Sequence, residues 1–145
     1  MDALDMKILD RLTRDGRCRA SALSQEVGLS VSAVIERIRK LEDSGIIRGY
    51  AAVLDQKRLG NDISAWMEVC LEHPRHYDTF VARVNADPSI LSCHYLTGDY
   101  DFILHIVAQS SEALEAIHRE IKGIPGVSST KTHFELKAVK NGYFV

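Results

Sequence analysis

Residues 20–41 decide the fold of the N-terminal part of this chain, and they read ASALSQEVGLSVSAVIERIRKL. Leu23 and Val27 lie four residues apart, which places them on one helical face, and Gly28 is a residue type that commonly ends a helix. Ser30 is a favourable N-cap for a further helix over residues 31–44. That helix is expected to bury Val34, Ile35, Ile38 and Leu41. The stretch therefore predicts two helices joined by a short glycine-containing turn.

The residues on either side of this stretch extend the pattern. A preceding helix over residues 2–14 has Asp2 or Asp5 available as its N-cap, and Asp15-Gly16 ends it. After the third helix, residues 46–54 form two short β-like runs on either side of Gly49, which predicts a small hairpin, or wing. We therefore expect an N-terminal winged helix-turn-helix domain over residues 1–54.

The exposed face of the helix over residues 31–44 is basic, which suits insertion into the major groove of DNA. Three cations of this helix and two outside it are expected to contact phosphates, and short or acidic side chains near its start are expected to approach base edges. A solvated helix face is the alternative interpretation. The predicted DNA-contacting residues are Arg17, Ser30, Ser32, Ala33, Glu36, Arg37, Arg39, Lys40 and Arg48.

The charge distribution agrees with a DNA-binding N-terminal part. The 145-residue chain has a net charge of −2, but residues 1–60 hold 11 Lys and Arg against 9 Asp and Glu, a net charge of +2. Residues 61–145 hold 7 against 11, a net charge of −4. The 46% hydrophobic content is that of a globular protein, and there is no apolar run long enough to span a bilayer and no basic secretory leader. These features predict a cytoplasmic protein.

Beyond a polar linker at residues 55–62, the apolar pattern changes from helical to alternating. The order of elements predicts a β-α-β-β-α-β domain over residues 63–145, in which four antiparallel strands carry two helices on one face, as in ferredoxin-like folds. Gly98-Asp99 is expected to form a two-residue hairpin turn between the middle strands. The fold class is α+β. The predicted strands and helices of this domain span residues 63–72, 77–85, 90–97, 100–108, 111–122 and 127–136.

The predicted sheet has apolar side chains on both faces, and helices can cover only one of them. Ile103 and Val107 alternate with Phe102, Leu104 and Ile106 along one strand. A second subunit is the economical cover for the other face, because large apolar patches are rarely left exposed on monomers. We therefore expect at least a homodimer.

Enzymatic and metal-binding motifs are absent from the sequence. It contains no GxSxG, P-loop, GxGxxG or HExxH pattern, so we expect no catalytic activity. The three cysteines form no CxxC, and the six histidines are best explained as ordinary strand and loop residues. The sequence predicts neither a metal site nor a cofactor.

The first half of the chain contains the segments ALSQEVGLS (residues 22–30), IERIRKLE (residues 35–42) and GIIRGY (residues 45–50). The second half contains LTGDYDF (residues 96–102) and a strand that ends in Thr132-His133-Phe134. Together these segments resemble the Lrp/AsnC (feast/famine) transcription regulators. The resemblance covers essentially the whole chain in the right order. It implies a winged helix-turn-helix followed by a regulatory (RAM/ACT-like) domain, and dimers that pair through their sheets and often assemble into octamers.

The resemblance also implies that a small amino acid binds at the interface between dimers. Gly98 lets the backbone approach a ligand, backbone amides in the turn can hold a carboxylate, and Asp99 or Asp101 can accept from an ammonium group. Ordinary turn chemistry is the alternative interpretation of this segment. The predicted effector-binding residues are Leu96, Thr97, Gly98, Asp99, Tyr100, Asp101, Thr132 and His133.

Two rival functions share the same scaffold. One is an enzyme resembling the sirohaem decarboxylases, and the intact Arg37, Arg39 and Lys40 on a helix suited to the groove argue against it. The other is a DNA-architectural protein that senses no ligand. The favoured prediction is a sequence-specific, amino-acid-responsive transcription regulator.

Overall fold

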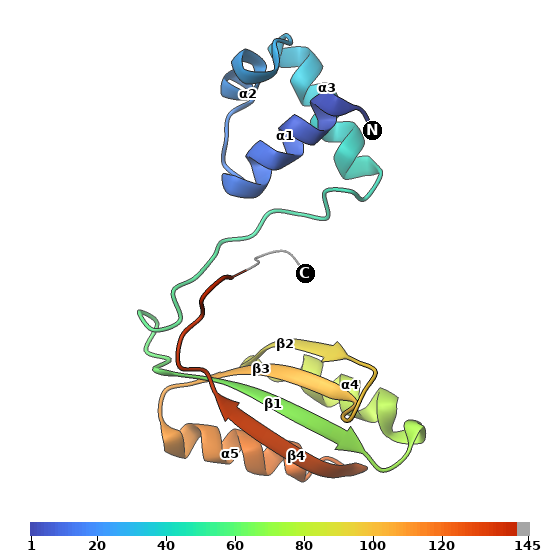
Figure 1. The fold of residues 1–145 in the computed structure, drawn as a ribbon, viewed down its shortest axis with the longest axis vertical. Helices are drawn as coiled ribbons and strands as arrows, with labels where there is room; N and C mark the ends of the chain where they lie inside the picture. The colour runs from blue at the N-terminus through green and yellow to red at the C-terminus, as the bar shows by residue number, and fades with distance from the viewer. Residues whose placement is uncertain (142–145) are drawn as a thin grey trace. The chain divides into compact units, whose positions relative to one another are not determined.

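The computed structural model describes residues 1–141, in two compact units that divide between Val53 and Leu54 (Figure 1). No helix among the described residues is long and apolar enough to cross a membrane. The first unit contains three helices, and the second contains a sheet with its own helices. Each unit has its own hydrophobic core.

The three helices of the first unit begin and end close to where the sequence predicts. Asp2 caps the first through a capping box with Asp5, and the Ser30 side chain accepts a hydrogen bond from the Ala33 amide at the start of the third. Gly28, at φ 70°, ends the second helix in the left-handed conformation that glycine adopts without strain. The helices are α1 (Ala3–Arg14), α2 (Ala20–Val27) and α3 (Val31–Asp43), and their core consists of Ile8, Leu12, Leu23, Val34 and Leu41.

Two details of the first unit differ from prediction. Ile35 is 54% exposed, because it lies about 100° around α3 from Val34, outside the face that packs on the core. The hairpin expected over residues 46–54 is not formed as a strand pair. A single glycine at residue 49 provides too short a loop for the two-residue turns that join paired strands. Instead, Ile47 packs on the core and Tyr50 donates a 2.9 Å hydrogen bond to Glu42 of α3.

The second unit is the predicted β-α-β-β-α-β domain, with the strands in the order β2-β3-β1-β4. Every neighbouring pair is antiparallel. The helices α4 and α5 pack on one face, where Phe80 and Ile121 meet Met67, Leu104 and the rest of a single core (Figure 1). The elements are β1 (Ile63–Leu71), a 3-10 turn (Pro74–His76), α4 (Tyr77–Asn85), β2 (Ile90–Tyr95), β3 (Phe102–Ala108), α5 (Ser111–Lys122) and β4 (Val127–Phe134).

The other face of the sheet carries a row of aromatic and ionisable side chains. Trp66 stacks on His105 with ring centroids 4.3 Å apart, and Ser64 Oγ lies 2.7 Å from the His105 Nε2 atom. Burial lowers the pKa of His105, so the neutral ring is favoured. On the far side of Trp66, the His133 Nε2 atom lies 2.7 Å from the Glu68 carboxylate. This face is thus built from specific polar and stacking contacts and not only from the apolar side chains expected.

Gly126 is required where the chain enters β4. Its φ is +90°, its carbonyl accepts a 2.7 Å hydrogen bond from the Glu72 amide, and a Cβ atom there would overlap the His76 ring. Gly60 has the same φ of +90° but open space around it. We predict that Gly60→Ala lowers the free energy of unfolding by about 1–2 kcal/mol from backbone strain. Gly126→Ala should lower it by about 1–3 kcal/mol more, because the added methyl also collides with a packed ring.

Urea unfolding of the full chain, followed by circular dichroism, measures both changes. Combining His76→Ala with Gly126→Ala should remove the collision and restore part of the loss. Equal destabilisation by the two glycine substitutions would contradict the prediction.

Candidate nucleic-acid interface and effector loop

Helix α3 presents most of the predicted DNA-contacting side chains to solvent. Ser32, Glu36, Arg39 and Lys40 are exposed, whereas Ala33 is half-buried. Ser30 is occupied as the cap of the helix, and its hydroxyl lies 3.2 Å from that of Ser32. Outside this helix, Arg17 and Arg48 are also exposed.

Arg37 is engaged within the unit and does not extend to solvent. Its Nη1 atom lies 2.7 Å from Asp2 Oδ2 and 2.7 Å from Asp5 Oδ1, and the side chain is only 28% exposed. The backbone amide of Asp5 and then Arg37 hold the pKa of Asp2 at about 2, and the two carboxylates raise the pKa of Arg37. Arg37 thus ties the start of α1 to α3. Its predicted contact with a DNA phosphate stays a prediction, and the Nε and Nη2 atoms would have to make it if these ion pairs persist.

The other cations of α3 are held only loosely. Arg39 lies 3.8 Å from Asp43 and Lys40 lies 3.7 Å from Glu36, and both basic side chains are more than 70% exposed. Exposed pairs of this kind contribute little to stability and exchange partners readily. These two cations can therefore bind a polyanion with only a small loss of free energy from their present ion pairs.

The segment that contains Gly98 is a six-residue loop and not the predicted two-residue turn. β2 ends at Tyr95 and β3 begins at Phe102. Asp101 is fixed where β3 begins, because its amide donates to the Val69 carbonyl (3.0 Å) and its carboxylate accepts from the Leu71 amide (2.7 Å). These two bonds hold Asp101 to the end of β1.

The loop presents its middle residues outward. The Leu96 amide donates to the Asp101 carbonyl at 2.8 Å and so closes the loop at its base. Between these ends, Thr97, Gly98 and Asp99 are exposed, and Tyr100 is half-buried. Gly98 has a φ of +122°, a backbone conformation that residues other than glycine rarely adopt. Asp99 is therefore available to a ligand, while Asp101 is committed to holding the loop.

Thr132 and His133 do not lie at the loop within one chain. They pair with Met67 and Trp66, whereas the loop is anchored at Val69 and Leu71. Being neighbours in a strand, the two side chains also point to opposite faces of the sheet. Thr132 Oγ1 is buried on the helix side without a hydrogen-bond partner.

Sequence reasoning missed two residues that the structure does bring to the loop. The Cys70 thiol donates to the Asp99 carbonyl at 3.5 Å, and the Ser128 hydroxyl donates to the Cys70 carbonyl at 3.1 Å. The antiparallel order of the strands could have suggested Cys70 and Ser128. In such a sheet the end of β1, the start of β3 and the start of β4 lie at the same end of the strands, where this loop also lies.

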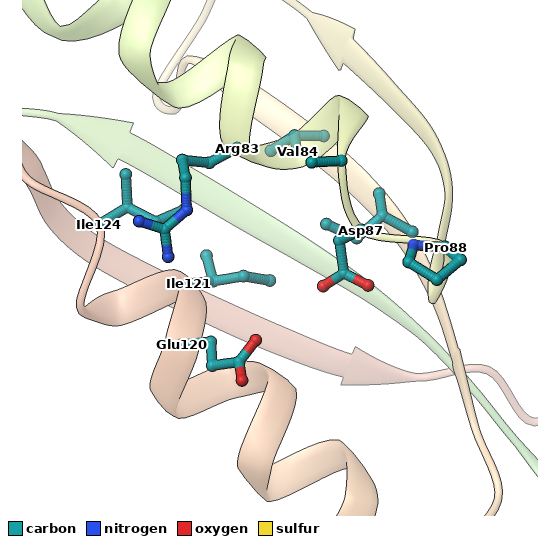
Figure 2. Close-up of a pocket in the computed structure, with 9 residues that line it drawn as sticks. Arg83, Val84, Asp87, Pro88, Glu120, Ile121 and Ile124 are labelled. Carbon is teal, nitrogen blue, oxygen red and sulfur yellow. The ribbon is translucent and has the colours of Figure 1, made fainter.

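A hollow of the second unit lies elsewhere, between the C-terminal ends of α4 and α5 (Figure 2). Its volume is about 300 Å³. Arg83, Asp87 and Glu120 surround it, and Val84, Ile121 and Ile124 form its floor. It contains none of the predicted effector-binding residues, so the loop and this hollow are two separate places in the domain. Among residues 1–141, no group of three or more potential ligand side chains could hold a metal ion.

Family models match both units. Residues 1–48 match the winged helix-turn-helix DNA-binding model, and residues 64–144 match the Lrp/AsnC ligand-binding domain. The class of protein is thus a DNA-binding transcription regulator with a separate ligand-binding domain. More specifically, the chain belongs to the Lrp/AsnC family, which confirms the resemblance seen in its sequence and the predicted fold class.

Individual relatives agree with this assignment. The chain is 37% identical to the Bkd operon transcriptional regulator of Pseudomonas aeruginosa over 96% of this chain and 93% of the relative. It is 34% identical to the leucine-responsive regulatory protein of Haemophilus influenzae, over 100% and 89% respectively. A solved transcriptional regulator from Neisseria meningitidis, in complex with L-methionine, has a TM-score of 0.94 at 32% identity, covering 99% of this chain and 94% of that one.

The ion pairs of Arg37 lead to a test by pH. Because the folded-state pKa of Asp2 lies below its unfolded value, this interaction stabilises the protein above the unfolded pKa and is lost as pH falls toward about 2. We predict that Arg37→Met lowers the Tm at neutral pH, and that the difference from wild type stays constant above about pH 5 and shrinks below about pH 4.

Calorimetry of the full chain between neutral and acidic pH measures this difference. Arg39→Met is the matched control, since among residues 1–141 Arg39 has a single ion pair, a 3.8 Å exposed contact, and the substitution should leave the Tm nearly unchanged. A deficit in Arg37→Met that did not vary with pH would refute the role assigned to this cluster.

Proposed function

We propose that this regulator binds specific DNA sequences as a dimer or a larger homo-oligomer, and that a small amino acid bound at the loop of residues 96–101 alters its DNA affinity. The observation that carries the proposal is the pairing of an exposed, loosely held basic face on α3 with an exposed loop that keeps an uncommitted carboxylate, Asp99. We place its action in the cytoplasm, where its DNA would be.

The DNA contacts divide by chemistry. Arg39, Lys40 and Arg17 are proposed to contact phosphates, together with Arg48, and Ser32 and Glu36 to approach base edges near the start of α3. Two copies of α3 in a dimer would enter successive major grooves, one helical turn of DNA apart.

The phosphate contacts predict a change in salt dependence. Each lost phosphate contact reduces the slope of log K against log salt concentration by about 0.9. Arg39→Ala should therefore lower the slope by about 1. Arg14→Ala is the matched control, because Arg14 is equally exposed (73% against 74%) but lies on α1, and it should leave the slope unchanged. Titration of the full chain with a labelled duplex at several salt concentrations measures both, and equal slopes for Arg39→Ala and wild type would contradict the assignment.

The oligomer is proposed to form through the outer face of the sheet. That face carries the stacked Trp66 and His105 and the pair of His133 with Glu68, and the two helices pack on the opposite face. Sheet-to-sheet pairing would bury these side chains and give a closed, two-fold assembly. Residues of a second subunit would then be able to complete the site at the loop.

An amino acid fits the chemistry of the loop. The ammonium group would be held by the Asp99 carboxylate, and the carboxylate would be held by backbone amides near Gly98, where the absence of a side chain allows close approach. L-Methionine is present in the solved complexes of the Neisseria meningitidis relative and of the feast or famine regulatory protein of Mycobacterium tuberculosis, which is 28% identical with a TM-score of 0.91 over 99% of this chain and 97% of that one. These complexes support an amino acid as the effector class.

A thermal-shift screen of the full chain against the twenty amino acids tests this proposal. A ligand at 100 times its dissociation constant stabilises the folded protein by about 2.7 kcal/mol, so a hit should be plain. We predict that Asp99→Ala abolishes the shift, and that the hit changes DNA affinity in the wild type only. Glu120→Ala is the control, since it alters the hollow between α4 and α5 and leaves the loop intact.

Loss of the shift in Glu120→Ala but not in Asp99→Ala would move the effector site to the hollow. A flat screen with intact DNA binding would leave a regulator that senses no amino acid, in keeping with an architectural role.

A further inference from the structure

Helix α3 exposes two apolar side chains whose position the packing of the unit does not explain. Val31 is 42% exposed and Ile35 is 54% exposed, and neither belongs to the core formed by the three helices. They are four residues apart, so they lie next to each other on one face of the helix. Both are in its N-terminal half, which is the part of a recognition helix that contacts base edges.

The polar side chains exposed near the start of α3, Ser32 and Glu36, cannot recognise an apolar group on a base edge. The Ser32 hydroxyl lies 3.2 Å from that of Ser30, which caps the helix. The Glu36 carboxylate lies 3.7 Å from Lys40. The exposed surface near the start of α3 thus combines these two polar side chains with the apolar Val31 and Ile35, and cations lie further along the helix.

We infer that Val31 and Ile35 contact the C5-methyl groups of thymines in the major groove and so determine part of the sequence specificity. The thymine methyl is the apolar group among the base-edge features of this groove, and aliphatic side chains recognise it by excluding water. The inference rests on the DNA-binding function and adds to it the bases that this helix selects.

The charges around the two side chains favour DNA over a second copy of the chain as the partner. Arg39 lies four residues beyond Ile35 and therefore on the same side of the helix, and its side chain is 74% exposed. Two copies of α3 packed through Val31 and Ile35 would bring the two Arg39 side chains toward each other, whereas a duplex would bring phosphates to them.

The decisive experiment removes the methyl group from the DNA instead of the protein. Duplexes are selected from a random pool with the full-length wild-type protein, and the selected duplex is resynthesised with uracil in place of thymine at one symmetric pair of positions at a time. Each methyl contact that is lost should weaken binding about four-fold, as expected for one buried methyl or methylene group. The same replacement should have no effect on the binding of Ile35→Ala or Val31→Ala, whichever makes that contact.

Matched variants and oligomer size complete the test. Alanine is the best helix former, so neither substitution should impair the fold, and Met6→Ala removes an equally exposed (52%) apolar side chain from α1 as a control. Uracil replacement should weaken the binding of Met6→Ala as it does that of wild type.

A selected duplex that is insensitive to every uracil replacement would overturn the inference and leave sequence-specific binding intact. No enriched sequence at all would overturn both, and a change in oligomer size for Ile35→Ala would assign the patch to a second copy.

Discussion

The central position of β1 constrains the whole second unit. This strand pairs with β3 on one side and β4 on the other, and its side chains alternate between the two faces of the sheet. Ala65, Met67 and Val69 are fully buried under the two helices, while Trp66 and Glu68 face the other way. A shift of one residue in either pairing would exchange the two faces, so the core and the outer face are specified by the same register.

The end of β1 also positions the loop of residues 96–101, which we propose as the effector site. Because the Leu71 amide and the Val69 carbonyl are both bonded to Asp101, the loop is fixed to the end of β1, while Leu96, Thr97, Gly98 and Asp99 are exposed. Because its base is already ordered, such a loop can bind a ligand without losing conformational entropy there. It is also well placed to transmit binding, since it is joined directly to the strand whose outer face we propose as the subunit interface.

Helix α3 combines three surfaces in one short segment. Val34 and Leu41 pack in the core, Arg37 binds the two carboxylates at the start of α1, and a third side remains exposed. The arrangement separates cations that hold the unit together from cations that are available to DNA, although all of them appear in the sequence as one basic run. It also leaves Ile35 exposed on the side of the helix that we propose faces the groove.

The sequence alone determined the α+β class, the order of the five α-helices and of the four strands of the second unit, and the family, because helical and alternating apolar periods and good caps such as Ser30 are local signals. Local signals do not reveal partners that are distant in the chain. Only the tertiary structure showed that Arg37 reaches Asp2 and Asp5, and that Asp101 is held by β1 at the base of a six-residue loop. It also separated Thr132 and His133 from that loop, since the faces and positions of strand residues follow from the register between strands, which no single segment encodes.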